Sequence, residues 1–292
     1  MKKAFLIIFI ICTGVAIFVA QQKKPVSKTF YAMGTNLTIT IAEDDYNEDI
    51  FETAFNEFKN VETLFKGKLD LTNEQVKQVY NTALKLQQQT NGVFSPYLAD
   101  VISLWQFDKT NKTIVKAPSE TQIKQALKSK TVNLYAIAKG YGIDVVANTL
   151  KQNNINNFIV NAGGDLYVQG TKFGKTWNVG LKYSNKLIAC ENTNYAIATS
   201  SNLYNSYEFN GKKYGHLING NTGWPVSAEK TITIIAPTAS IADGLATAIF
   251  LDETLFEKIS KDERDIAMLK QDVENFSTLN LAKNCKVKKI GL

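Results

Sequence analysis

The chain contains one histidine, and it is the first residue that could do chemistry at neutral pH. His216 lies at the end of an expected strand, directly before the turn-rich run over 219–225. Histidine is a natural general base near pH 7. A lone histidine at a strand edge is more often structural, and no Gly-x-Ser-x-Gly sequence indicates a serine hydrolase. Taken alone, His216 leaves a catalytic and a structural role open.

Asp243 and Thr247 form a second candidate site, because residues four positions apart share one face of a helix. A carboxylate and a hydroxyl are hard oxygen ligands that suit Mg²⁺. The structural alternative is that the run from Ser240 to Asp243 begins a helix and that the carboxylate stabilises the first turn. Without further context, these residues favour the capping interpretation.

Three polar or glycine-rich runs are candidates for binding phosphate. Lys139 and Gly140 lie at the expected start of a helix over 143–150, where a lysine and free N–H groups suit an anion. The run over 161–165 contains paired glycines after a short strand, which let a ligand approach the backbone. Hydroxyl groups cluster over 199–202. Ordinary turns are the alternative for the last two runs.

The elements that must position these residues are helices and strands in mixed order. Apolar residues at helical spacing predict helices over 46–65, 72–90, 120–128, 143–150 and from 240 to about 260. Strand patterns cover 37–41, 158–160, 165–169, 176–181, 186–189, 195–199, 206–209, 213–218 and 231–236. Because these elements do not alternate as regular βαβ units, we expect an α+β fold.

The composition is that of an ordinary globular protein: 292 residues, 45% hydrophobic and 21% charged, with a net charge of +6. No dense basic run with interleaved aromatics is present, so we expect no nucleic-acid partner. The mild positive charge suits an anionic small ligand. The cysteines are Cys12, Cys190 and Cys285, without a Cys-x-x-Cys pair, so a structural zinc site is not expected. Nothing in their spacing indicates a disulfide.

The N-terminus predicts export. Lys2 and Lys3 precede an uncharged apolar run over 4–20. We assign 1–20 to a signal peptide or membrane anchor, 21–28 to a linker and 29–292 to a single domain. Cleavage and retention of the segment both stay open. We therefore expect an exported protein that is periplasmic, or anchored to the inner membrane through this segment and facing the periplasm.

Several short motifs occur here in the same order as in one known family. They are Met33-Gly34-Thr35, Ala138-Lys139-Gly140-Tyr141 with Asp144, Asn161-Ala162-Gly163-Gly164-Asp165-Leu166, Ala198-Thr199-Ser200, His216-Leu217-Ile218 with Thr222-Gly223-Trp224-Pro225, and Ala242-Asp243-Gly244-Leu245-Ala246-Thr247-Ala248. Over about residues 29–260, the chain resembles the FAD:protein FMN transferases, the ApbE family. Each motif is weak by itself, and their shared order makes the resemblance strong.

The resemblance implies a T-fold-like mixed sheet flanked by helices, which forms a single catalytic domain and binds FAD and Mg²⁺. It implies transfer of the FMN moiety of FAD to a Thr or Ser hydroxyl of an acceptor flavoprotein, a subunit of a membrane redox complex, with release of AMP. His216 would be the catalytic residue that helps to deprotonate the hydroxyl. The implied metal ligands are Ala136 through its carbonyl, Asp243 and Thr247. The implied FAD contacts are Met33, Val93, Phe94, Ser95, Asn133, Lys139 and Ile218.

The chain departs from the family pattern at a few positions, and two other functions stay open. Asn133 stands where the family usually has Asp, Tyr135 where it usually has Gly, and the loop over 66–69 is short. One alternative is a Mg²⁺-dependent FAD pyrophosphatase, which would release FMN and AMP through the same site. The other is a non-catalytic flavin-binding protein. The histidine and the metal-ligand pair argue against it, since a binder needs no base.

Overall fold

The computed structural model describes residues 23–44, 46–181, 186–190, 194–203, 206–227, 229–262, 266–272, 276–279 and 285–289. The predicted signal peptide or anchor over 1–20 lies outside these residues. Among the helices that are described, none is long and apolar enough to cross a membrane.

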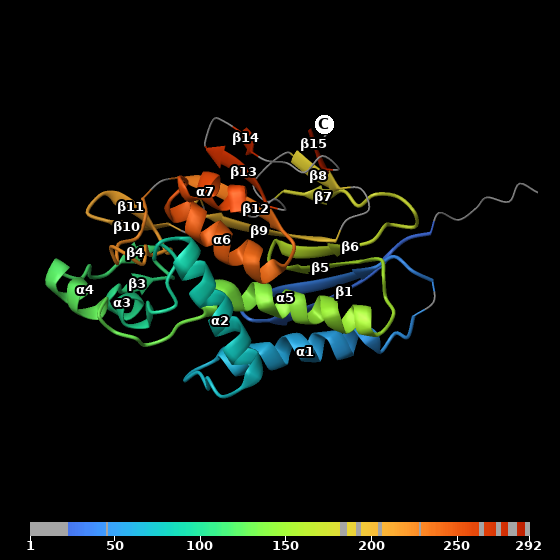
Figure 1. Ribbon diagram of the computed structural model, residues 1–292, viewed down its shortest axis with the longest axis horizontal. Helices are drawn as coiled ribbons and strands as arrows, with labels where there is room; N and C mark the ends of the chain where they lie inside the picture. Colours follow the sequence, from blue (N-terminus) through green and yellow to red (C-terminus); the bar gives the residue numbers. More distant parts are fainter. Residues whose placement is uncertain are drawn as a thin grey trace, which may run out of the picture.

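A large antiparallel sheet is the centre of the fold (Figure 1). Its strands, in spatial order, are β1 (Val26–Ala32), β2 (Thr35–Ile41), β5 (Phe158–Ala162), β6 (Asp165–Gln169), β9 (Tyr195–Ser201), β12 (Lys230–Ala236), β13 (Ala267–Asp272) and β14 (Phe276–Leu279). The middle strands are buried on both faces. In β9, Ala196 and Ala198 face the helices, whereas Ile197 packs in a separate cluster on the opposite face. Both faces of these strands are therefore covered by other parts of the fold.

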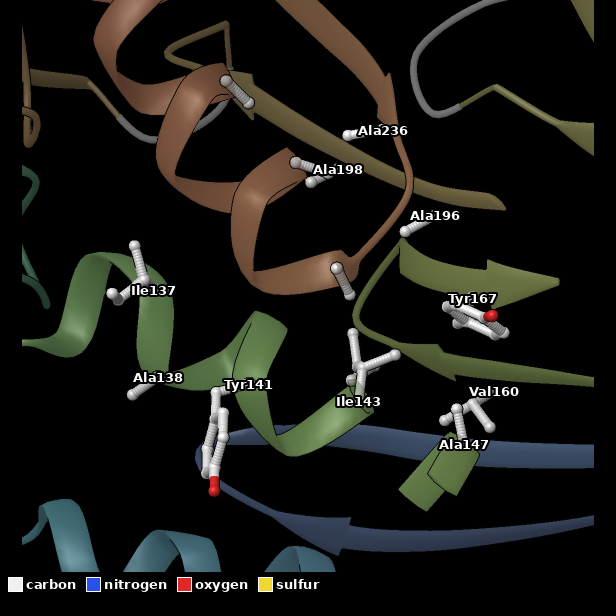
Figure 2. Packing of buried hydrophobic residues seen from close by; sticks show 14 of the residues in the cluster. Ile137, Ala138, Tyr141, Ile143, Ala147, Val160, Tyr167, Ala196, Ala198 and Ala236 are labelled. Carbon is white, nitrogen blue, oxygen red and sulfur yellow. The ribbon is translucent and has the colours of Figure 1, made fainter. Parts of the chain in front are cut away.

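Helices cover one face of this sheet. α5 (Tyr135–Gln152) lies between α1 (Ile50–Phe65) and α6 (Ala239–Leu251), as Figure 1 shows. α6 approaches the sheet over small side chains, among them Ala196, Ala198 and Ala236 (Figure 2). α2 (Glu74–Gln89) and α7 (Leu255–Asp262) pack at the edges of this layer. The opposite face carries a small sheet of β15 (Cys285–Lys289), β8 (Lys186–Cys190) and β7 (Val179–Gly180).

A subsidiary unit with its own apolar cluster sits at one end of the molecule (Figure 1). It comprises α3 (Ala99–Leu104), α4 (Glu120–Ala126) and a sheet of β11 (Lys212–Gly215), β10 (Ser206–Phe209), β4 (Thr113–Ile114) and β3 (Phe107–Asp108). Trp105 donates its indole N–H to the Gly223 carbonyl at 3.0 Å, which ties the unit to the run after His216. The mixed sheets and flanking helices confirm the expected α+β fold.

The start of α5 differs from the sequence prediction. The helix begins at Tyr135, so Lys139 and Gly140 lie inside it and not at a free N-terminus. Asn133 accepts the Tyr135 N–H at 3.0 Å, and Ile137 and Ala138 continue the buried face. The prediction that free N–H groups surround Lys139 is therefore wrong, because the Gly140 N–H is already bonded within the fold.

Other parts of the structure also differ from the sequence prediction. β1 begins at Val26 and pairs with β2 along its length, so the fold extends into the range 21–28 that was assigned to a linker. The predicted helix from 240 to 260 is divided into α6 and α7. The break lies at Asp252, which accepts the Thr254 N–H directly before α7 begins. Strands β13 to β15 had no sequence prediction.

The contact between α5 and α6 leads to a stability prediction. A Cβ atom on Gly140 would lie 2.3 Å from the Ala239 carbonyl oxygen, which is backbone and cannot rotate away. We expect Gly140→Ala to lower the free energy of unfolding by about 1–3 kcal/mol or more, because the helices must separate. Urea unfolding measures this. Asn148→Ala, exposed on the same helix, is the control and should change stability by less than about 0.5 kcal/mol. Equal stabilities would contradict the close contact.

Candidate active site

Two adjoining cavities lie where α5, α6 and the run after β11 meet. The larger has a volume of about 600 Å³, within the roughly 300–1,000 Å³ range of small-molecule sites. The smaller measures about 250 Å³ and contains the polar groups. Both cavities are lined by Tyr135, Ala136, His216, Leu217 and Thr247. A ligand longer than either cavity could therefore extend across both of them.

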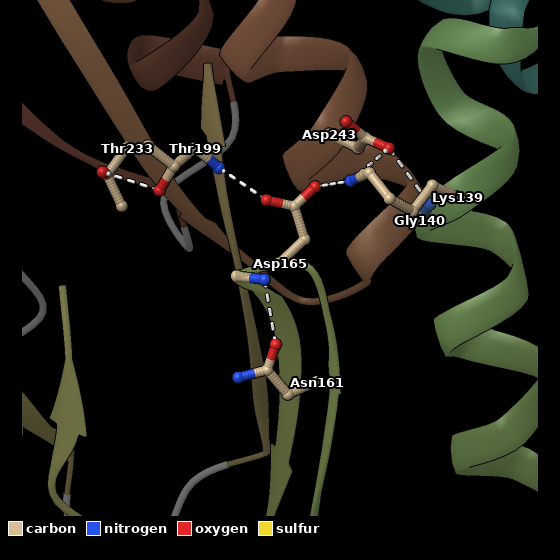
Figure 3. Close-up of polar contacts among 8 residues, drawn as sticks. Lys139, Gly140, Asn161, Asp165, Thr199, Thr233 and Asp243 are labelled. Carbon is tan, nitrogen blue, oxygen red and sulfur yellow. Dashed lines mark hydrogen bonds and ion pairs between the residues drawn. The ribbon is translucent and has the colours of Figure 1, made fainter. Parts of the chain in front are cut away.

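An ion cluster forms one wall of the smaller cavity (Figure 3). The Lys139 ammonium forms an ion pair with the buried carboxylate of Asp165 and lies 3.4 Å from the Asp243 carboxylate. Asp165 also accepts the Thr199 N–H at 2.9 Å. The cluster brings together the three runs that the sequence analysis singled out for phosphate binding, since Lys139, Asp165 and Thr199 each come from one of them.

Asp243 connects the two helices. Its side chain accepts the Gly140 N–H at 3.0 Å, and it makes no cap on its own helix. The N-cap of α6 is Thr238, whose hydroxyl accepts the Ile241 N–H at 3.3 Å. Burial raises the pKa of the Asp243 carboxyl, while Lys139 and the Gly140 N–H oppose that rise. The capping interpretation of Asp243 is therefore wrong, because the carboxylate faces α5 and the smaller cavity.

The oxygen donors at this junction fit a hard cation. Asp243 and Thr247 are buried residues of α6 that line the smaller cavity together with Ala136. A carboxylate, a hydroxyl and a backbone carbonyl form a donor set typical of Mg²⁺. Across the part of the chain that the structure describes, no group of three or more His, Cys, Asp or Glu side chains could hold a metal.

Two loops from distant parts of the sequence contact each other beside the larger cavity. The Val93 carbonyl accepts the Gly220 N–H at 2.8 Å, and the Asn221 side chain donates to the Asn91 carbonyl at 3.0 Å. A Cβ on Gly220 would lie 2.3 Å from the Gly92 carbonyl oxygen, so this approach requires glycine. The loops bring the predicted contacts to one cavity, which is lined by Val93, Phe94, Ser95, Asn133 and Ile218.

The remaining predicted residues differ in their placement. His216 is exposed at the junction of the two cavities, directly after β11. Lys139 lines the smaller cavity only. Met33, at the turn between β1 and β2, packs against the main apolar core and lines neither cavity. Its role as an FAD contact stays a prediction without support from this arrangement.

Sequence reasoning missed several residues that line the site. Asp165 was assigned no role, although a carboxylate directly after paired glycines at a strand turn was a usable signal. The aromatic rings of Tyr135, Phe107 and Tyr207 line the larger cavity, as do Lys109 and Lys112. These residues lie in separate elements, and no local pattern could have united them.

Comparison with known proteins identifies the family. The model of the ApbE family matches residues 33–269, so the chain belongs to the ApbE family. It is 29% identical over 238 residues to a Haemophilus influenzae protein named FAD:protein FMN transferase, covering 70% of this chain and 67% of that one. The Escherichia coli K12 protein of the same name is 26% identical over 239 residues, covering 70% and 68%. These names confirm the family and the transferase enzyme class expected from the sequence.

Solved structures show the same fold. The flavin transferase ApbE from Vibrio cholerae aligns with a TM-score of 0.69 at 21% identity, covering 88% of this chain and 96% of that one. The ApbE protein from Thermotoga maritima aligns with a TM-score of 0.70 at 22% identity, covering 91% and 97%. At these identities the likeness concerns the fold alone.

The ion cluster predicts that Lys139 and Asp165 are coupled in their effects on the free energy of unfolding. Lys139→Met and Asp165→Asn should each destabilise the protein, and the double variant should lose less than the sum, with a coupling of about 1–3 kcal/mol. The reason is that each single variant removes the ion pair between Lys139 and Asp165 while leaving the other charged group in the cluster. Urea unfolding of the four proteins measures the coupling. The exposed pair Lys213 and Glu229 is the control and should couple by less than about 1 kcal/mol. A coupling near zero at Lys139 and Asp165 would contradict the cluster.

Proposed function

We propose that this chain transfers the FMN moiety of FAD to a Thr or Ser hydroxyl of an acceptor protein and releases AMP. The observation that carries the proposal is the junction of the cavities. His216, Ala136 and Thr247 border both spaces, so a general base and oxygen donors lie beside the point where an extended ligand would pass. The family and the names of the relatives give the chemistry of that ligand.

The larger cavity suits a ring system and the smaller cavity suits a pyrophosphate. Phe94, Phe107 and Tyr207 give the larger space aromatic surface, which packs well against planar rings. Lys139 lines the smaller space and supplies positive charge for phosphate oxygens. Serine and threonine hydroxyl groups at 199–201 line the same space and can donate hydrogen bonds to phosphate.

The proposed transfer step uses these positions. The hydroxyl oxygen of the acceptor attacks the phosphorus on the FMN side of the pyrophosphate, and the bond from that phosphorus to the AMP oxygen breaks. His216 takes the hydroxyl proton, because a neutral hydroxyl is a poor nucleophile. The exposure of His216 gives the acceptor access to it. Lys139 stabilises the negative charge that develops on the phosphate oxygens.

We propose that Mg²⁺ is held by the Ala136 carbonyl, Asp243 and Thr247. When bound, it would neutralise pyrophosphate charge. The donor set and the burial of both side chains support this assignment.

We also propose that the protein is exported and acts on a subunit of a membrane redox complex. The N-terminal sequence supports export. Cys285 is disulfide-bonded, and the register of β15 and β8 places Cys190 opposite it. Disulfides persist mainly outside the reducing cytosol. The sequence analysis did not anticipate this disulfide, because the spacing of the cysteines gave no indication of it.

The function is tested by mixing the protein with FAD, MgCl₂ and an acceptor subunit that carries a candidate Thr site. We expect covalent fluorescent flavin on the subunit after denaturing electrophoresis, and its loss when EDTA is present. Release of free FMN and AMP without labelling would contradict the transferase and indicate the pyrophosphatase. Bound but unreacted FAD would contradict both enzymes and leave the flavin-binding protein.

His216→Ala tests the base. We expect the transfer rate to fall by a factor of about 10²–10⁴, the usual contribution of a general base. FAD affinity, measured by titration of flavin fluorescence, should stay unchanged. Transfer at the wild-type rate would remove His216 from the mechanism.

Asp243→Ala tests the metal site. We expect Mg²⁺-dependent turnover to be lost while the circular dichroism spectrum stays native, because Asp243 lines the smaller cavity and caps no helix. Glu208→Ala, an exposed carboxylate on β10 outside both cavities, is the control and should keep its turnover. Unfolding of the Asp243 variant would instead assign the carboxylate a purely structural role.

A further inference from the structure

A carboxylate on α5 holds the beginning of α6. Asp144 accepts the Ala239 N–H at 2.7 Å, the Ser240 N–H at 2.9 Å and the Ser240 hydroxyl at 2.7 Å. The first N–H groups of a helix have no partner within the helix and carry its positive end. Burial raises the pKa of the Asp144 carboxyl, and the hydrogen bonds from Ser240 and Ala239 oppose that rise.

This contact is separate from the N-cap of α6. Thr238 is the N-cap, and its hydroxyl accepts the Ile241 N–H. Asp144 accepts hydrogen bonds from other N–H groups of α6, those of Ala239 and Ser240, and Asp144 itself belongs to α5. The helix therefore has one contact that stabilises its end and a second that fixes its end to α5.

The two helices run antiparallel, and their contacts recur at intervals of three or four residues. Asp144 lies against Ala239 and Ser240. One turn earlier on α5, Gly140 donates its N–H to Asp243. A further turn earlier, Ala136 lines the same two cavities as Thr247. The three levels follow one row of residues on each helix, so the contact at Asp144 contributes to how the other two levels align.

We propose that Asp144 is a positioning residue for the metal site: by fixing the axial register of α6 against α5, it aligns Asp243 and Thr247 with the Ala136 carbonyl. The inference rests on the proposed Mg²⁺ site. A slide of α6 by one residue would move both ligands by about 1.5 Å. Metal–oxygen distances tolerate only about 0.2 Å, so even a small loss of register would weaken the site. Asp144 itself touches no metal ligand in these contacts.

The test compares two variants that both remove a hydrogen bond from the start of α6. Asp144→Asn weakens the tie to α5, whereas Thr238→Ala removes the N-cap and leaves the tie. Mn²⁺ serves as the probe, and free Mn²⁺ is measured by electron paramagnetic resonance. We expect Asp144→Asn to weaken Mn²⁺ binding by about 10–100-fold, the usual effect of removing a group that supports metal ligands. Thr238→Ala should weaken it by less than about twofold, although losing a cap costs about 0.5–2 kcal/mol of stability.

A second readout separates positioning from loss of structure. In the transfer assay, Asp144→Asn should raise the Mg²⁺ concentration that gives half the maximal rate, while the rate at saturating Mg²⁺ returns close to that of the wild type. If Asp144→Asn does not fold, Ser240→Ala removes the hydroxyl contact to Asp144, together with the weaker 3.3 Å contact to the Thr238 hydroxyl, and leaves both backbone N–H contacts. It should shift Mn²⁺ affinity in the same direction by a smaller factor.

Three results would overturn the inference. In the first, Asp144→Asn binds Mn²⁺ like the wild type. In the second, Thr238→Ala weakens binding by the same factor as Asp144→Asn, so that the effect follows stability and not register. In the third, the wild type binds no Mn²⁺. That result would contradict the proposed metal site itself, whereas the first two leave it intact and reject only the role of Asp144.

Discussion

The close antiparallel packing of α5 against α6 is the constraint on which the rest of the site depends. Gly140 has no room for a side chain beside the Ala239 carbonyl, and its N–H is used by Asp243. Two carboxylates on these helices, Asp144 and Asp243, therefore lie where each accepts a backbone N–H from the other helix. Such groups must be partnered when they are buried. The same contacts that satisfy them bring Ala136 and Thr247 to the junction of the cavities.

The ligand cavity is completed by segments that only the fold unites. The loop over 91–95 follows α2, and the loop over 219–222 follows β11, yet each satisfies backbone groups of the other. The large sheet contributes Asp165 and Thr199 from neighbouring strands, which hold Lys139 toward the smaller cavity (Figure 3). The arrangement separates an aromatic space from a charged one, with His216 at the border between them.

Much of this could be predicted from the sequence wherever the signal was local. The apolar spacing of α1 and α2 gave correct helices. The ordered motifs identified the family and collected several residues that line the two cavities, although Met33 lines neither. The errors came from long-range contacts. Asp243 resembled a cap because its true partner, the Gly140 N–H, lies on another helix. The ion pair of Lys139 with Asp165 and the pairing of β1 at Val26 likewise depend on tertiary structure.

The most direct test of the central claim is anomalous diffraction from crystals soaked in Mn²⁺. The account predicts one strong anomalous peak at the α5–α6 junction, bounded by the Ala136 carbonyl oxygen, the Asp243 carboxylate and the Thr247 hydroxyl. A peak elsewhere in the molecule, or no peak at a Mn²⁺ concentration that supports turnover, would contradict it. The helix pair would then be a structural feature of the fold and not the frame of a metal site.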